Sequence, residues 1–516
     1  MSKKNGALIF YGFVFLILLI FGVDLFDKVW SFPSFSPVPL LIVALLGAGI
    51  YTTIKLKFPQ LRYLIHGFRV TRGDYDNPDE EGDLNHFQAL TTALSATVGI
   101  GNIAGVATAI YYGGPGALFW MWITALFGSA LKFAECTLAV HYRDFDNKGM
   151  TAGGPMYTIE KGLGKQWRWL AIVFAGFTII CSFATGNAVQ SNTLSLQIYS
   201  EISQVIGIEH FLTIKREFFN SYSVSVLQII NGVIIAGIAG LVIIGGIKRI
   251  GNVTSFLAPF MAAVYVFAAL LILLSNFSEI PSSFLMIIDM AFNPPAVIGG
   301  AAGGTFLVFM NTMLYGIMRG LYSNEAGQGS APIAHSTAKT NYPVREGVVA
   351  LLEPFIDTII ICTLTGLAII STGAWHYTEF YSSRIDPSFS DTLLNGSVLT
   401  SEAFKIGLSW LFPFGDKIIS LGVLLFAIST VISWSFYGDR ATEYLFGEKG
   451  IPIYRIAYII FVFIGAISTL EAIWKFGDAA LGLMTFPNLI SIIMLSGVLK
   501  KMTNEYFSRE HKVYKK

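Results

Sequence analysis

The sequence has few charged residues for its length. Only 13% of its 516 residues are Asp, Glu, Lys or Arg, whereas a soluble globular chain has about a quarter. The formal net charge of +1 gives no support to a nucleic-acid partner. Hydrophobic residues make up 54% of the chain, and the mean hydropathy is +0.62. These values predict an integral membrane protein.

Cysteines and clustered histidines are also scarce. The three cysteines, Cys136, Cys181 and Cys362, lie in apolar segments without the paired spacing of a disulfide framework or a zinc site. The seven histidines are scattered, mostly in expected loops, and form no cluster with cysteine. We find neither a phosphate-binding loop nor a nucleophile beside a base. We therefore expect a protein that is not an enzyme and needs no organic cofactor.

Long apolar runs, by contrast, are abundant. About twelve are long enough to cross roughly 30 Å of hydrocarbon. They are Ala7–Val23, Val38–Ile54, Ala89–Tyr111, Gly116–Tyr142, Trp169–Leu194, Val224–Ile244, Val253–Ser275, Ile298–Met318, Val348–Thr372, Ile418–Phe436, Tyr454–Trp474 and Ala479–Val498. The first run resembles a signal peptide but lacks a convincing cleavage site, so we expect it to be retained.

Lysine and arginine alternate between successive loops. Every second loop is basic, and the ends of the chain carry Lys3-Lys4 and Lys515-Lys516. Because basic loops remain in the cytoplasm, the sequence predicts a multi-pass protein of the cytoplasmic membrane with both termini inside. The segments Ile280–Val297 and Thr372–Phe414 are predicted outer loops.

The third run carries a glycine-rich interruption. Val98-Gly99-Ile100-Gly101-Asn102 places two glycines within three residues, and each costs a helix about 1 kcal/mol. A helix broken here exposes carbonyls at the end of its first half and amides at the start of its second. These ends favour a cation and a carboxylate, respectively, as in a secondary transporter site. The alternative is a packing face formed by Gly101 and Gly105.

A second interruption is predicted in the eighth run, where Gly316 and Gly320 lie about half-way along. The third run crosses from inside to outside and the eighth crosses back, so two inverted five-helix repeats account for both. The predicted units are two peripheral helices over residues 1–60, repeats over 85–280 and 298–500, and a cytoplasmic tail over 501–516.

Three motifs, Thr91–Asn102, Gly113–Trp122 and Ser323–Pro332, together resemble the alanine/glycine:cation symporter family. The resemblance covers the chain from about residue 38 to about residue 498. It implies an all-α integral membrane protein with a five-plus-five inverted-repeat, LeuT-type fold, two broken helices and 11–12 transmembrane helices. It also implies cation coupling, usually by sodium, and small neutral amino acids as substrates. The run Ala7–Val23 departs from the family, which usually begins with a short amphipathic segment.

The resemblance further implies where the cation and the substrate carboxylate bind. In this fold, amides around Gly99–Asn102 hold the carboxylate, and hydroxyls of the tenth run complete a sodium site with carbonyls of the first broken helix. Such oxygen ligands suit a hard cation. The predicted sodium ligands are Ser95, Thr97, Val98, Asn102, Ser429 and Thr430. For Ser429 and Thr430 the alternative is a bond to the preceding turn of their own helix.

Polar and aromatic side chains of the fifth run predict part of the substrate pocket. Asn187 and Gln190 share a helical face with Phe183, and intramembrane amides are costly unless they face a cavity or another helix. Trp434 is predicted to limit the size of the substrate, with ordinary packing as the alternative. The full predicted substrate set is Thr97, Gly99, Gly101, Asn102, Phe183, Asn187, Gln190, Gly316, Ile317, Gly320 and Trp434.

Several charges fall within or near the apolar runs, where they need partners or water. They are Lys132, Glu135, Arg319, Glu325, Glu353 and Asp357. We expect Lys132 and Glu135 to form an i,i+3 pair. Arg319 is predicted to close a cytoplasmic gate with Glu135, Glu325 or Glu353, and structural ion pairing is the alternative.

Together with these features, the resemblance implies a sodium-coupled symporter that imports alanine and glycine by alternating access. Its expected partners are the amino acid, sodium and the lipid bilayer. The alternatives are a preference for glutamine or serine, coupling to protons and, more remotely, an ion channel, which needs a repeated carbonyl filter.

Overall fold

The computed structural model describes residues 39–77, 79–146, 149–217, 223–296, 304–468 and 470–514, so the first predicted run lies outside it. The described chain is mainly helical. Its paired strands are two short hairpins, β1 (Asp144–Phe145) with β2 (Thr151–Ala152) and β3 (Lys215–Glu217) with β4 (Ser223–Ser225). The predicted all-α class is confirmed.

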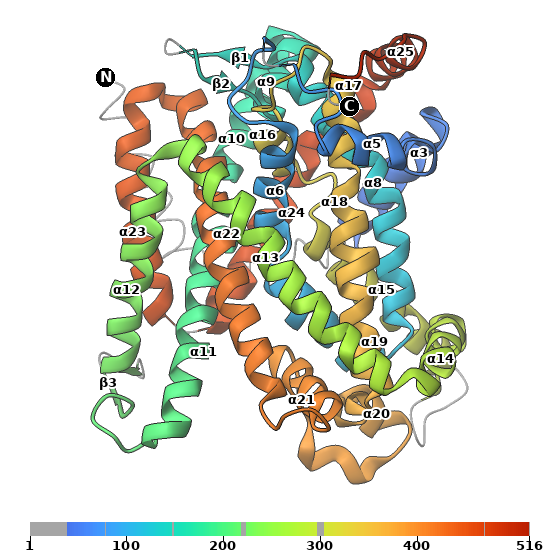
Figure 1. Ribbon diagram of the computed structural model, residues 1–516, viewed down its shortest axis with the longest axis vertical. Coiled ribbons are helices and arrows are strands. Elements are labelled where there is room, and N and C mark those ends of the chain that lie inside the picture. The colour runs from blue at the N-terminus through green and yellow to red at the C-terminus, as the bar shows by residue number, and fades with distance from the viewer. Residues whose placement is uncertain are drawn as a thin grey trace.

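Most helices run along the long axis of the molecule (Figure 1). Among the described residues, seven are long and apolar enough to cross a membrane, and two bent pairs raise this number to nine. The end of the molecule that carries α25 and the hairpin β1–β2 is termed the α25 end, and the opposite one the α21 end.

The first half of the described chain contains three helices before the first break, a broken helix and a series of long spans. Its helices are α3 (Leu40–Lys55), α4 (Pro59–Arg62), α5 (Leu64–Thr71), α6 (His86–Thr97), η1 (Gly101–Gly105), α7 (Val106–Gly113), α8 (Ala117–His141), α9 (Pro155–Tyr157), η2 (Thr158–Leu163), η3 (Lys165–Trp167), α10 (Arg168–Phe183), η4 (Ala184–Ala188), α11 (Val189–Ile206), α12 (Val226–Ile243), α13 (Gly246–Ser275), η5 (Phe277–Glu279) and α14 (Ile280–Phe292).

The second half has the same order of spans. Its helices are α15 (Gly304–Asn324), α16 (Ala331–His335), α17 (Pro343–Ala350), α18 (Leu352–Pro354), η6 (Phe355–Cys362), α19 (Thr363–Ser371), η7 (Ala374–Tyr377), α20 (Glu379–Arg384), η8 (Pro387–Thr392), α21 (Ser397–Leu408), α22 (Gly415–Phe446), η9 (Glu448–Gly450), α23 (Ile451–Ile467), α24 (Leu470–Met494) and α25 (Ser496–Phe507). The segments η1, η2, η4 and η6 are π-helical.

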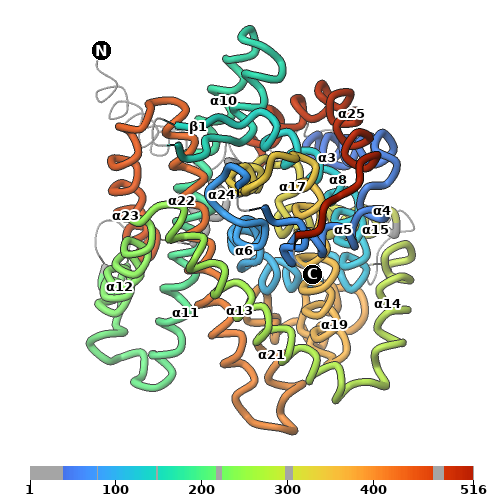
Figure 2. The backbone as a smooth tube through the Cα atoms, turned by 45° about the horizontal axis from the view of Figure 1, so that its top comes forward, coloured from blue at the N-terminus to red at the C-terminus, as the bar shows by residue number. Residues whose placement is uncertain are grey.

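Helices that correspond in the two halves pack against each other. α7 contacts α15, α8 contacts α17, α10 and α11 contact α22, and α12 contacts α23. The last pair forms one edge of the molecule in both views, beside the inclined helix α13 (Figures 1 and 2). Two repeats related by an approximate two-fold axis produce this pattern. The predicted repeat boundaries remain a prediction.

Local sequence explains where α6 begins. Asn85 precedes it, and the Asn85 side chain accepts a hydrogen bond from the Gln88 amide at 2.8 Å. The Gln88 side chain in turn accepts one from the Asn85 amide at 3.2 Å, which completes a capping box. This cap fixes the start of the helix that leads into the first break.

The predicted outer loops contain helices that the search for long apolar runs missed. α14 lies in the first of these segments, and α20 and α21 lie in the second, all at the α21 end (Figure 1). They have only 13, 6 and 12 residues, which is too short to span a bilayer as a helix.

Candidate functional site

The first broken helix consists of α6 and its continuation η1–α7, and the two parts are bent by 52°. Val98 leaves the helical conformation, with φ −71° and ψ 91°. The side chain of Asn102 replaces the missing backbone bond, because its Oδ1 accepts a hydrogen bond from the Gly99 amide at 2.9 Å. A Cβ atom at Gly101 would lie 3.3 Å from Cα of Ser323, so glycine permits close approach to α15. This break lies where the sequence predicted it.

The second break lies beyond the predicted one. α15 continues unbroken to Asn324, and the helix resumes as α16 at Ala331. Between them, Glu325, Gly327 and Gly329 have φ values of 50°, 78° and 86°. Gly accepts this left-handed conformation without steric cost, whereas Glu325 adopts it at a cost. Two broken helices are therefore present, as predicted, but the position of the second requires correction.

Gly316 and Gly320 instead allow α15 to pack closely on α8. A Cβ atom at Gly316 would lie 2.3 Å from the carbonyl oxygen of Ala117, and one at Gly320 would lie 2.2 Å from the hydroxyl of Thr124. Ile317 between them is only 2% exposed and belongs to the hydrophobic core. Two glycines four residues apart are typical of helix contacts in membranes. The predicted break at these glycines is wrong, which removes the reason for assigning these three residues to the substrate site.

Glu135 of α8 holds the unwound segment of the second broken helix. Its carboxylate accepts hydrogen bonds from the amides of Gly327 at 3.3 Å and Gly329 at 3.2 Å, and from Asn488 Nδ2 at 2.6 Å. Glu325 is also engaged locally, since its carboxylate accepts a hydrogen bond from Ser330 at 2.6 Å. Glu135 thus satisfies two backbone amides that the break leaves without helical partners.

Two hydroxyls of α22 converge on the end of α6. Ser429 donates to the carbonyl of Ser95 at 3.2 Å, and Thr430 donates to the same carbonyl at 3.1 Å and to that of Ala96 at 3.4 Å. Both hydroxyls also lie within hydrogen-bond distance of the carbonyl of Phe426, one turn earlier in their own helix. The predicted sodium ligands Ser95, Ser429 and Thr430 are therefore brought together. Ala96, which the sequence analysis did not select, joins them.

The other predicted sodium ligands, Thr97, Val98 and Asn102, remain predictions, and the structure gives the contacts of their neighbouring groups. The Thr97 hydroxyl donates to the carbonyl of Ala93 at 3.2 Å. In the part of the chain that the structure describes, neither Ser429 nor Thr430 has a hydrogen bond to Val98. Asn102 is fully buried, and its Nδ2 points toward η6.

Asp357 in η6 joins the two broken helices. Its carboxylate accepts hydrogen bonds from Asn102 Nδ2 at 2.6 Å, from Ser323 at 2.7 Å and from Thr358 at 2.8 Å. Asn102 Nδ2 also lies 3.3 Å from the sulfur of Cys362 in the same π-helical segment. Asp357 is 0% exposed and has no ion-pair partner among the described residues. The sequence marked it only as a charge near a gate, because the break that it contacts is distant in the chain.

The predicted pocket residues of the fifth run lie around η4. Gly186 packs directly on Trp434 of α22, where a Cβ atom would lie 2.3 Å from the indole. Asn187 donates through Nδ2 to the carbonyl of Tyr458 at 2.8 Å, and the Phe183 ring lies 5.8 Å from that of Tyr458. The structure therefore brings Phe183 and Asn187 to α23, and Trp434 to η4.

Several polar atoms in this region are buried without a hydrogen-bond partner among the described residues. They are Asn187 Oδ1, Gln190 Oε1, Ser433 Oγ, Trp434 Nε1 and Tyr437 Oη. The Tyr437 ring lies 5.1 Å from that of Trp434. Buried polar groups normally have partners, so this group marks a place where a polar ligand or water fits. Tyr437 was missed, although it lies only three residues after Trp434 in the same helix.

The buried charges pair differently from the prediction. Lys132 binds Glu353 at 3.1 Å rather than Glu135. Arg319 has no ion pair with any described residue, and its Nε is buried without a partner. The predicted gate between Arg319 and these acids is therefore wrong, because each acid already has other partners.

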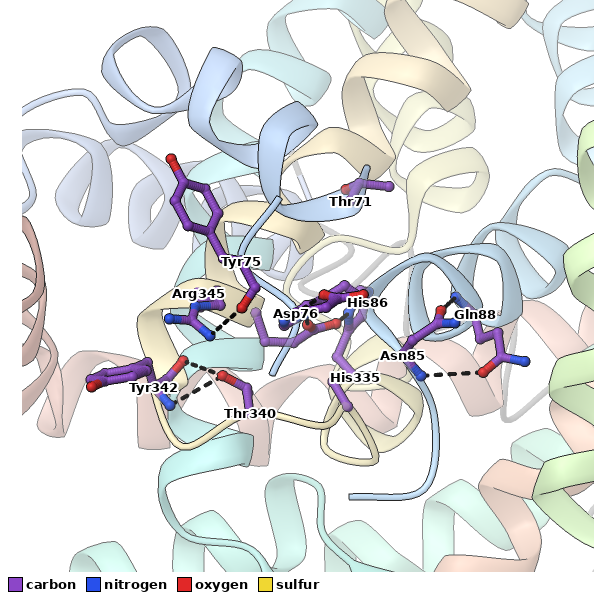
Figure 3. A network of polar contacts seen from close by, with 12 residues as sticks. Thr71, Tyr75, Asp76, Asn85, His86, Gln88, His335, Thr340, Tyr342 and Arg345 are labelled. Atoms are coloured by element: carbon purple, nitrogen blue, oxygen red, sulfur yellow. Dashed lines mark hydrogen bonds and ion pairs between the residues drawn. The ribbon is translucent and has the colours of Figure 1, made fainter. Parts of the chain in front are cut away.

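Two of the histidines are not in solvated loops. His86 and His335 are 1% and 0% exposed and lie on opposite sides of Glu346, which contacts both rings. Figure 3 shows the two imidazoles converging near the start of α6. The expectation of scattered loop histidines is wrong for this pair. The sequence does not show their contact, because 249 residues separate them in the chain.

Comparison with known proteins identifies the family of this chain. The model of the sodium:alanine symporter family matches residues 24–516. The sodium/alanine symporter AgcS of Methanococcus maripaludis is 40% identical over 94% of this chain and 98% of its own. An uncharacterized transporter of Haemophilus influenzae is 42% identical over 91% and 93%, respectively. The crystal structure of MhsT in complex with L-phenylalanine covers 81% of this chain and 99% of its own, with 13% identity and a TM-score of 0.49. The chain is thus a multi-pass membrane transporter, not an enzyme, and belongs to the sodium:alanine symporter family.

Proposed function

We propose that the chain is a sodium-coupled symporter that imports alanine and glycine across the cytoplasmic membrane. The observation that carries this proposal is the convergence of Ser429 and Thr430 on the Ser95 carbonyl at the end of α6. The similarity of this chain to the sodium/alanine symporter AgcS supports sodium as the cation and alanine as a substrate. Both termini would lie in the cytoplasm, in line with the distribution of basic loops.

The oxygen atoms at this place suit a small hard cation. The hydroxyl of Thr430 lies 3.1 Å and 3.4 Å from two carbonyl oxygens. A cation that contacts oxygens at about 2.4 Å fits between atoms separated by such distances. On binding, the hydroxyl hydrogens turn away and their lone pairs face the ion. The carbonyls at the end of α6 add the negative end of the helix dipole.

Asp357 provides a second centre of negative charge at the break. A buried carboxylate without a positive partner costs several kcal/mol, and a bound cation removes this cost. Its bonds to Asn102 and Ser323 connect the two broken helices, so cation binding here orders both. The amides that follow Gly99 in the break then face the substrate carboxylate, while the Gly99 amide itself stays bonded to Asn102. Each ligand thereby raises the affinity for the other, and this coupling is reciprocal.

The packing of Trp434 on Gly186 favours a small substrate, because the indole fills space that a larger side chain needs. Glutamine or serine is the second candidate. The unpartnered oxygens of Asn187 and Gln190 are acceptors that an amide or hydroxyl of the substrate satisfies.

Uptake of labelled alanine into proteoliposomes tests the proposal, with inward gradients of sodium, lithium, potassium or protons compared. We expect accumulation with sodium and competition by glycine. Uptake driven only by protons would contradict the cation site at Ser429 and Thr430. Stronger competition by glutamine or serine than by glycine would contradict the proposed substrate and favour the second candidate.

A further inference from the structure

A row of five buried titratable side chains runs inward from the start of α6. Glu346 contacts His86 Nδ1 through Oε2, and its Oε1 lies 2.5 Å from His335 Nδ1. His335 Nε2 lies 2.7 Å from Glu353 Oε1, and Glu353 Oε2 lies 3.1 Å from Lys132 Nζ. None of the five side chains is more than 1% exposed. The transport cycle proposed above uses none of them.

We assign the protons of this row from its contacts, with both carboxylates ionised. Ionised carboxylates only accept hydrogen bonds, so both nitrogens of His335 carry hydrogen and its ring is an imidazolium. We assign the Nδ1 hydrogen of His86 to its contact with Glu346, and in a neutral ring Nε2 is then the bare nitrogen. Two positive groups, Lys132 and His335, then balance two carboxylates. A neutral sum is what a fully buried network requires.

The bare nitrogen of His86 lies on the side of the ring that faces Asp76, a partly exposed residue. Nε2 is buried and has no hydrogen-bond partner among the described residues. The nearest carboxylate oxygen in the described part of the chain is Asp76 Oδ1 at 4.0 Å, and it has no hydrogen-bond partner there either (Figure 3). The Asp76 side chain is 43% exposed and lines a surface pocket of about 690 Å³ with Thr71 and Asn85. A proton from solution therefore reaches this nitrogen past one exposed carboxylate.

We propose that His86 and Asp76 form a proton-binding site at the α25 end, and that the proton bound there controls the movement of α6. Protonation of Nε2 turns His86 into a donor, and the Asp76 carboxylate is its acceptor. The pair closes by about 1 Å to reach hydrogen-bond distance. The new ion pair ties the first residue of α6 to the segment before it, while Glu346 holds the other side of the ring.

The other charged groups around this site are already engaged. Arg345 of α17 binds Glu80 at 3.2 Å, and Arg143 donates to the carbonyls of Ser336 and Ala338 at 3.0 Å and 2.6 Å. In the segment before α6, Asp74 binds Arg72, and Asp83 accepts a hydrogen bond from the Thr151 amide. Cys136 Sγ lies within 4.8 Å of ligand atoms of His335 and Glu353, but both His335 nitrogens already face carboxylates, so we assign no metal there. Among the described residues, Asp76 is the carboxylate that faces Nε2 of His86.

The expected consequence is slower transport when the α25 side is acidic. α6 carries the Ser95 carbonyl of the proposed cation site, so a tether at its start opposes any displacement that opens this site. The tether does not touch Ser429 or Thr430. Acid therefore lowers the turnover rate and leaves the sodium concentration for half-maximal uptake unchanged.

Nitrogen-15 NMR of histidine-labelled protein in nanodiscs tests proton binding without any transport measurement. At about pH 8 we expect His86 as the neutral Nδ1–H tautomer and His335 as an imidazolium. Acidification to about pH 5 converts His86 to an imidazolium and leaves His335 unchanged. His86→Asn, which retains a donor to Glu346, identifies the signal. Asp76→Asn removes the acceptor and weakens the response of this signal to acid, and this exposed substitution identifies the signal even if His86→Asn does not fold. A His86 signal that is constant from pH 8 to pH 5, or unmoved by Asp76→Asn, overturns the proposal.

Uptake rates at the same pH values provide the second measurement, which rests on the proposed function. We expect the wild-type rate to fall several-fold between about pH 8 and about pH 5.5, and the His86→Asn rate to stay within about twofold. His141→Asn, at the same end of the molecule but outside the network, retains the wild-type dependence. Loss of uptake in every protein would overturn the proposed function alone, whereas equal pH dependence in wild type and His86→Asn would overturn the control of α6.

Discussion

The proposed cation site is tested most directly by replacing Thr430 with valine. Valine has nearly the same shape, so the substitution removes an oxygen atom and leaves the packing of α22 on α6 in place. Ser429 still donates to the Ser95 carbonyl at 3.2 Å, so we expect the unliganded protein to lose only about 1 kcal/mol of stability.

The effect on sodium is expected to be much larger. The Thr430 oxygen lies 3.1 Å and 3.4 Å from the carbonyl oxygens that complete the site. A polar contact with a charged group contributes about 1.5–3 kcal/mol. At about 1.4 kcal/mol for each factor of ten, Thr430→Val raises the sodium concentration for half-maximal uptake by about 10- to 150-fold.

The assay is alanine uptake into proteoliposomes over a series of sodium concentrations. Thr430→Ser is the matched control, because it retains the hydroxyl and loses only a methyl group, and it stays close to wild type. Maximal uptake at saturating sodium is expected to change less than the sodium affinity. A valine variant with unchanged sodium dependence and normal uptake would refute Thr430 as a ligand.

Three further predictions concern packing, buried charge and pH. Gly316→Ala places a methyl group 2.3 Å from a backbone carbonyl oxygen of α8 and costs about 1–3 kcal/mol. Gly176→Ala, with nothing within 4 Å, instead stabilises its helix by about 0.5–1 kcal/mol, so equal melting temperatures of the two variants would contradict this contrast. Lys132→Met removes one of the two positive partners of the buried Glu353, His335 being the other, and the uncompensated negative charge costs about 3–5 kcal/mol in thermal unfolding. Adding Glu353→Gln recovers part of this loss, and a double variant no more stable than the single one would refute the explanation. Burial lowers the pKa of His66 on α5 from 6.5 to about 4, and its Nε2 lies 2.8 Å from a tyrosine hydroxyl of α25. Because the unfolded chain binds this proton at higher pH, stability falls as the pH drops from about 6.5 to about 4. Hydrogen exchange of α25 then accelerates in wild type but not in His66→Gln. The same acceleration in both proteins would contradict the assignment of this pH dependence to His66.

The first break was predictable because the residues that weaken the helix and the residue that bonds the freed amide are neighbours in the sequence. Gly99 and Gly101 weaken the helix, and Asn102, three residues after Gly99, supplies the side chain that bonds its amide. Both features are local, so a reading along the chain finds them. The convergence of Ser429 on Ser95 was expected only through the family resemblance, since it joins residues 334 positions apart.

The second break and the histidine pair were not predictable in this way. Glycines at 316 and 320 suggest a break and a packing face equally well, and only the position of α8 decides between them. The actual break depends on Glu325 in a left-handed conformation, which its residue type disfavours. His86 and His335 acquire their role from Glu346, which reaches both only once α6 and α17 are packed together.

The π-helical segment η6 has a consequence for how the chain tolerates insertions and deletions. Asp357 and Cys362 are five residues apart, and both reach the same amide nitrogen of Asn102. In a regular α-helix, positions with this spacing differ by about 140° in direction. The wider π turn brings them to one face, which is equivalent to accommodating one extra residue. Deleting a single residue from η6 would therefore rotate everything that follows by about 100°. Thr365, whose hydroxyl bonds the Asn102 carbonyl at 2.9 Å, would then face a different neighbour, although its own sequence surroundings are unchanged.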